Sequence, residues 1–127
     1  MDVYAFSIGF LIFLNITFWI SSYDKVFDFK GNLQWMIPHF AQSPLKNVVP
    51  LALTILTFFE VATAFMSAFA LYELLVNDTL QWVFFANVFH LIALFLMLTA
   101  QRLAKDFDGA RTIVIYLIPG MIALLIL

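Results

Sequence analysis

The sequence predicts an all-α transmembrane four-helix bundle with a short interfacial segment between the first two spans. Hydrophobic residues make up 65% of the 127 residues and charged residues only 11%, and the apolar residues gather in four long segments. A soluble domain carries roughly 25% charged residues, and small domains leave much of their surface in water. Lipid is therefore the expected solvent for most of this chain.

The four apolar segments have the length of membrane helices, which need about 20 residues to cross a hydrocarbon core of about 30 Å. We expect spans at about 3–20, 48–75, 80–100 and 112–127, all within a single domain, 1–127. The first span lacks a preceding basic segment and a small-residue cleavage site, so we expect a retained helix rather than a signal peptide. The segments also lack the alternating pattern of membrane β-strands.

The connection between the first two spans, residues 23–47, is long and partly apolar. Leu33, Trp35 and Phe40 belong to an apolar cluster that Pro38 interrupts. We expect an amphipathic helix that lies in the membrane interface and stops before Pro38. The same residues could instead form a docking surface for another protein.

Charge predicts the orientation of the spans. The 6 Lys and Arg residues all fall in the first and third connections, and none lies at either terminus or in the middle connection. The positive-inside rule places basic connections in the cytoplasm. We therefore expect a multi-pass protein of the cell (inner) membrane with both termini outside.

Glu60 is the first candidate site residue, because it lies near the middle of the second span. An ionised carboxylate at that depth costs several kcal/mol, so we expect the group to be protonated or paired inside the bundle. Ala64 and Ser67 lie on the same helical face, and such small residues let helices approach closely. Glu60 is therefore expected to face other helices rather than lipid.

His90 in the third span is the expected partner of Glu60, at a comparable depth. Asn87 lies on the same face as His90, and Asn15 approaches from the first span. Such a cluster could hold or move a proton, or hydrogen-bond the head of a quinone or lipid. The alternative is that these groups bond one another and only fix helix packing.

A further set of polar residues lies at the expected cytoplasmic ends of the spans. Asp24 and Lys25 follow the first span, and Arg102 follows the third. These residues could anchor the helices in the interface through salt bridges. In a functional interpretation, Lys25 and Arg102 close a polar entrance beneath Glu60.

Composition excludes several classes of site. The chain has no Cys and 2 His, and its 6 basic against 8 acidic residues form no basic surface for nucleic acid. The second histidine, His39, lies in the first connection, so a haem or metal site within the chain is not expected. No catalytic arrangement is recognisable, which favours a non-enzymatic role.

Short motifs give a family resemblance. The first span ends in the run Ser21–Phe29 (SSYDKVFDF), an interfacial stretch with proline follows, and the second span contains Glu60–Ala64 (EVATA). In this order the chain resembles the DoxX-like family of small four-span membrane proteins over about its first two thirds. It departs from the family pattern by Ser and Ala where glycines are usual. The resemblance implies an accessory or assembly subunit of a larger membrane complex, respiratory or quinone-linked in some relatives.

Three functions therefore stay open. The first is the accessory subunit, which would contact other membrane subunits or copies of itself. The second is a membrane protein that binds a quinone, a lipid or a proton at Glu60 and His90. The third is an emopamil-binding-like enzyme or sterol site, and the lack of a second acid in the middle of the spans counts against it. A quinone or lipid from the membrane is the cofactor to expect, and none is expected within the chain itself.

Overall fold

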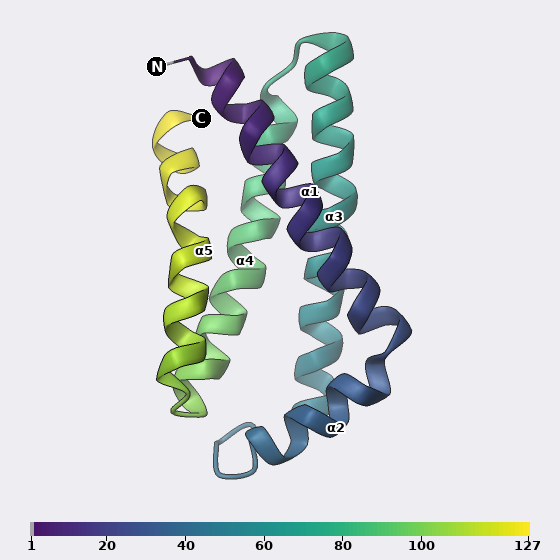
Figure 1. The fold of residues 1–127 in the computed structure, drawn as a ribbon, viewed down its shortest axis with the longest axis vertical. Helices are drawn as coiled ribbons and strands as arrows, with labels where there is room; N and C mark the ends of the chain where they lie inside the picture. The colour runs from purple at the N-terminus through teal and green to yellow at the C-terminus, as the bar shows by residue number, and fades with distance from the viewer. Residues whose placement is uncertain (1) are drawn as a thin grey trace.

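The computed structural model describes residues 2–127, which form five α-helices and contain no β-strand. The helices are α1 (Val3–Phe27), α2 (Phe29–His39), α3 (Val49–Asn77), α4 (Gln81–Leu103) and α5 (Phe107–Ile126) (Figure 1). Four of them, all except α2, are long and apolar enough to cross a membrane. The predicted fold class is confirmed, and the protein is an integral, multi-pass membrane protein.

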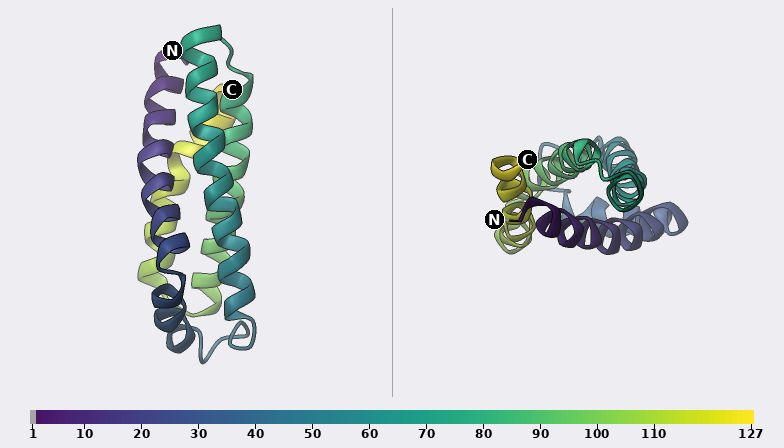
Figure 2. Two further views of the ribbon diagram at one scale, coloured as in Figure 1. Left: turned by 90° about the vertical axis from the view of Figure 1, so that its right-hand side faces the viewer. Right: turned by 90° about the horizontal axis from the view of Figure 1, so that it is seen from above.

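The long helices pack side by side along the long axis of the molecule (Figure 2). α3 packs against both α1 and α4, and α5 packs against α4. Both termini and the α3–α4 connection lie at one end, and α2 and the other two connections lie at the opposite end (Figure 1). We call the parts of the helices toward these two ends the terminal half and the loop half.

Small side chains bring the helices together in the terminal half. Ala64 and Ala70 of α3 and Ala86 of α4 have no exposed surface, so the two backbones approach closely, as small residues allow in membrane helices. α1 adds larger side chains to the same apolar cluster: Phe10, Leu11, Leu14 and Phe18. This half of the molecule is therefore a packed core.

Aspartates define where three of the helices begin. The side chain of Asp2 accepts hydrogen bonds from the first backbone N–H groups of α1, and Asp28 and Asp106 do the same for α2 and α5. These bonds satisfy N–H groups that have no partner within the helix. Asp28 also marks the joint at which the chain turns from α1 into α2.

α1 extends past its predicted end at about residue 20 and continues to Phe27. The polar residues Ser21 and Lys25 were expected to follow the span, but they are four positions apart and so share one helical face. That face meets α3, where both side chains find partners. Polar residues with partners inside the bundle do not end a helix.

The prediction that the interfacial helix stops before Pro38 is wrong, because Pro38 lies inside α2. Proline near the end of a helix removes a single backbone donor, and the backbone N–H of Phe40 still donates to Met36 O at 2.9 Å. None of the residues of α2 is buried. This exposure is what an interfacial helix requires, and the interfacial position stays a prediction.

All the basic residues lie in the loop half or in its connections: Lys25, Lys30, Lys46, Arg102, Lys105 and Arg111. The charge asymmetry that predicts the orientation thus coincides with one end of the fold. The orientation itself, with both termini outside, stays a prediction.

Candidate functional site

An ion pair joins α1 and α3 in the loop half. The Lys25 Nζ lies 2.9 Å from Glu60 Oε2, with the Lys25 side chain 17% exposed and the Glu60 side chain 2% exposed. Ser21 Oγ donates to Glu60 Oε1 at 2.6 Å, and Lys25 Nζ donates to Ser21 Oγ at 2.9 Å. Glu60 is therefore paired inside the bundle, in line with one of the two states expected for it.

The local sequence explains why this pair forms. On α1, Ser21 and Lys25 stand one helical turn apart and reach the same carboxylate. On α3, Thr63, Ala64 and Ser67 follow Glu60 on the buried side and have no exposed surface. Their small size lets α1 approach closely enough for Ser21 to bond Glu60 directly. Pairing with Lys25 offsets part of the cost of placing the carboxylate in the membrane.

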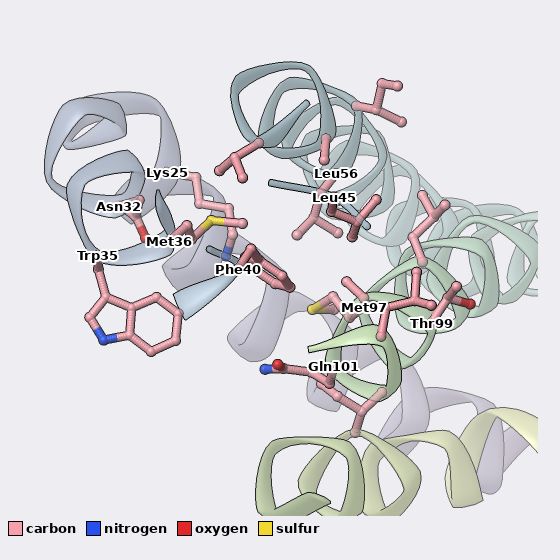
Figure 3. Close-up of a pocket in the computed structure, with 17 residues that line it drawn as sticks. Lys25, Asn32, Trp35, Met36, Phe40, Leu45, Leu56, Met97, Thr99 and Gln101 are labelled. Carbon is pink, nitrogen blue, oxygen red and sulfur yellow. The ribbon is translucent and has the colours of Figure 1, made fainter. Parts of the chain in front are cut away.

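The Lys25 side chain also lines a cavity of about 410 Å³, which we call the α2-side cavity. Its wall is mostly apolar and comes from α2, α3, α4 and α5; it includes Met36, Phe40, Ala52, Leu56, Met97 and Ile113. Figure 3 shows Lys25 and Met36 on one side of this space and Leu56 and Met97 on the other. A cationic group thus enters a largely apolar cavity from its edge.

A second space, which we call the α1-side cavity, has a volume of about 470 Å³ and is a groove open to the outside rather than an enclosed cavity. It lies between α1, α4 and α5 and is lined by residues that include Ile16, Ile20, Ser21, Glu60, Leu94 and Tyr116. Glu60 and Ser21 line this cavity, whereas Lys25 lines the α2-side cavity. The ion pair therefore lies at the junction of the two spaces.

The structure does not bring His90 to Glu60. α3 and α4 are joined at the terminal end, so depths are measured from Asn77 and Gln81. At a rise of about 1.5 Å per residue, Glu60 lies about 26 Å from Asn77 and His90 about 14 Å from Gln81. The predicted equal depth is wrong by about 12 Å on this count, and no hydrogen bond or ion pair joins the two side chains in residues 2–127.

His90 is instead enclosed by aromatic rings. The rings of Phe10, Phe13 and Phe18 meet it nearly edge-on, with centroids 5.8, 6.2 and 5.4 Å away. The side chain has no exposed surface, and neither ring nitrogen makes a well-aligned hydrogen bond in residues 2–127, although the backbone of Tyr116 offers an acceptor nearby. His90 lines neither cavity, so its geometry is that of a core side chain.

The two predicted asparagines act within and between helices. Asn15 stays on α1, where it donates to Leu11 O at 2.8 Å and accepts from Trp19 Nε1 at 3.0 Å. Asn87 donates from Nδ2 to Gly120 O at 2.9 Å and so joins α4 to α5. Neither side chain lines a cavity. Their contacts fit the structural alternative, in which polar groups fix helix packing.

Of the predicted residues at the span ends, Lys25 enters the site and Arg102 does not. The Arg102 guanidinium carbon lies 4.8 Å from the centre of the Phe107 ring, and the side chain lines neither cavity. Asp24 is exposed and lines the α1-side cavity. Lys25 therefore lies at the edge of a cavity beside Glu60, whereas Arg102 does not; a polar entrance at this place stays a prediction.

A contact at the loop end was not foreseen from the sequence. His39 Nε2 lies 3.0 Å from Gln101 Oε1 and 3.4 Å from Asp106 Oδ2, and the Trp35 ring stacks on the imidazole with centroids 4.5 Å apart. Nε2 faces two oxygen acceptors, so the tautomer with a hydrogen on Nε2 fits these contacts. These bonds attach the end of α2 to the α4–α5 turn beside the α2-side cavity.

Ser21 is the other residue that the sequence reasoning missed. Its spacing of four positions from Lys25 was a usable signal, since residues so spaced lie on the same face of a helix. For His39 and Gln101, which are far apart in the sequence, there was none. In residues 2–127, no group of three or more His, Asp or Glu side chains lies together as metal ligands would.

Comparison with known proteins adds no relative. No family model matches the chain, and no curated protein or solved structure matches it either. The DoxX-like resemblance therefore stays a hypothesis carried by the motifs at Ser21–Phe29 and Glu60–Ala64. The firm conclusion is a multi-pass membrane protein whose loop half holds a buried ion pair between two cavities.

Proposed function

We propose that this protein binds a small amphipathic molecule from the bilayer, with its polar head at the Lys25–Glu60 pair and its apolar part in the α2-side cavity. One observation carries the proposal: Lys25 belongs both to the ion pair and to the wall of an apolar cavity. Ligand sites are typically apolar spaces of about 300–1,000 Å³ with a few placed polar groups. The cavity meets both conditions.

The ammonium group is suited to hold a neutral acceptor such as a quinone or ester carbonyl. A lysine ammonium has three donors, one of which goes to Ser21 while Glu60 supplies the counter-charge. Electrostatic attraction is stronger away from water, and the contacts with Ser21 and Glu60 hold the group in position. A quinone or a glycerolipid therefore fits the chemistry of this end of the cavity.

The proposal is tested by filling the cavity. Wild-type protein in mild detergent should bind decylubiquinone or monooleoylglycerol, as measured by native mass spectrometry. Ala52 lines the cavity and is partly buried on α3, so Ala52→Phe should weaken binding at least tenfold. Ala62 is also partly buried on α3 but lines neither cavity; Ala62→Phe should bind as the wild type does. Equal binding by both variants would contradict the proposal.

A second candidate is the accessory or assembly subunit that the DoxX-like resemblance suggests. It is favoured by a broad aromatic surface, which includes the exposed side chains of Phe58, Phe65, Phe69, Phe84 and Phe95. Such rings could pack against helices of other subunits as well as against lipid. Purification in mild detergent followed by mass spectrometry tests this role, and a protein that always purifies alone would speak against it.

A further inference from the structure

Resting on the proposed function, we infer that the ligand is a neutral membrane lipid with two apolar chains, one on each side of the Lys25–Glu60 pair. The geometry points to this class because the pair has a cavity on both sides. Lys25 lines the α2-side cavity, and Glu60 lines the α1-side cavity. A head held at the pair is therefore at the entrance of both spaces.

The two cavities also share part of their walls. Met97 of α4 and Ile113 of α5 line both of them, so these two side chains lie between the two spaces. Methionine is flexible and fills irregular gaps readily. A molecule that branches at its head can place one branch in each cavity once the Met97 side chain adjusts.

Each cavity alone is large enough for one chain. Their volumes are about 410 and 470 Å³, and both are in the range of small-molecule sites. A ligand with one chain leaves one cavity to be filled by another molecule. A ligand with two chains fills both cavities but loses the translational and rotational entropy of only one molecule. The second chain binds within the same complex, because it is linked to the first.

The charge at the junction selects a neutral head. Lys25 and Glu60 neutralise each other, so a charged head would leave an unpaired charge in apolar surroundings, which is costly. The Lys25 ammonium already contacts Ser21 Oγ and Glu60 Oε2 and has one donor left for an ester carbonyl. Ser21 and Glu60 line the α1-side cavity, where a hydroxyl of the head can meet them. Diacylglycerol carries both groups next to two chains.

The test compares two lipids that share a glycerol head. Dioleoylglycerol and monooleoylglycerol are titrated into the 127-residue protein in mild detergent, and bound lipid is measured by native mass spectrometry. We expect the two-chain lipid to bind at least tenfold more tightly. Equal affinities, or a preference for the one-chain lipid, would overturn the inference while leaving the proposed function intact.

Blocking the α1-side cavity makes the test specific. Ile16 lines this cavity and is 60% exposed, whereas Ile12 lies one turn earlier on α1, is 46% exposed and lines neither cavity. Ile16→Trp should remove the advantage of dioleoylglycerol and leave monooleoylglycerol binding unchanged, and Ile12→Trp should change neither. Ile20→Trp, from the same cavity wall, serves as an independent second block.

The remaining outcomes are also decisive. If both blocking variants bind dioleoylglycerol as the wild type does, the second chain does not use the α1-side cavity and the inference is wrong. If the folded wild-type protein binds neither glycerolipid, the inference is wrong as well. Binding of decylubiquinone in that case would preserve the proposed function, and its absence would end both.

Discussion

The two halves of the molecule differ in the surroundings of their buried polar groups. The terminal half packs small residues and rings so closely that His90, without a well-aligned hydrogen bond in residues 2–127, has no exposed surface. The loop half keeps cavities and places a full ion pair beside them. The comparison teaches that burial alone does not mark a functional group. A polar group that borders open space is the better candidate.

The largest expected effect comes from breaking the ion pair. Lys25→Met should destabilise the protein by about 3 kcal/mol, because removing one partner of a buried pair leaves the other charge uncompensated. The double variant Lys25→Met with Glu60→Met should recover most of that loss, since apolar pairs replace buried ion pairs at little cost. Unfolding free energies in bicelles measure both effects.

The same double variant separates stability from function. It should fold well yet bind monooleoylglycerol and decylubiquinone at least tenfold more weakly, because the polar head has lost its partners. A double variant that is stable and binds normally would show that the pair is only a structural contact. The loop half would then resemble the terminal half, and the comparison between them would fail.

Packing in the terminal half gives the next largest effect. A Cβ at Gly120 would lie 2.8 Å from Leu91 Cδ2 and 2.9 Å from His90 Cδ2, whereas a Cβ at Gly9 would meet nothing within 4 Å. Gly120→Ala should therefore destabilise by about 2 kcal/mol through overpacking. Gly9→Ala is the matched control and should stabilise α1 by about 0.5 kcal/mol, since alanine is the better helix former.

Thermal unfolding of both glycine variants in detergent checks this contrast. Similar melting temperatures for Gly120→Ala and Gly9→Ala would mean that the side chains around Gly120 can move to accommodate an added methyl group. Neither variant should alter ligand binding, because neither glycine lines a cavity.

The fold was largely predictable from the sequence, and the site only in part. Four apolar segments of membrane length determine the spans because lipid requires them, whatever their partners are. The inward direction of Glu60 followed from the small residues around it. Its partner did not, because the choice between His90 and Lys25 depends on how far α1 continues past residue 20. Helix length is set by contacts between α1 and α3, and the four-residue spacing of Ser21 and Lys25 was the one local signal for them.

Loosening the attachment of α2 to the α4–α5 turn should lower the stability by less than the changes above. His39 bonds Gln101 and approaches Asp106, while α2 itself has no buried residue. His39→Ala should cost about 1 kcal/mol, the usual value of one hydrogen bond. The loss should appear as faster hydrogen exchange over residues 29–39, with exchange in α3 and α4 unchanged. A uniform change across all helices would show that α2 is not held separately.

The smallest expected effect is at His90, and it is the sharpest test of the comparison. Leucine in place of this histidine removes two ring nitrogens that lack well-aligned hydrogen bonds in residues 2–127 and keeps an apolar side chain of similar size. Because a buried polar group without a partner carries a desolvation cost, His90→Leu should leave the unfolding free energy unchanged or raise it by about 1 kcal/mol. Ligand binding should be unchanged, since His90 lines neither cavity. If His90→Leu folds normally but loses the ligand, the polar group in the terminal half is functional after all, and proximity to open space is the wrong criterion for this protein.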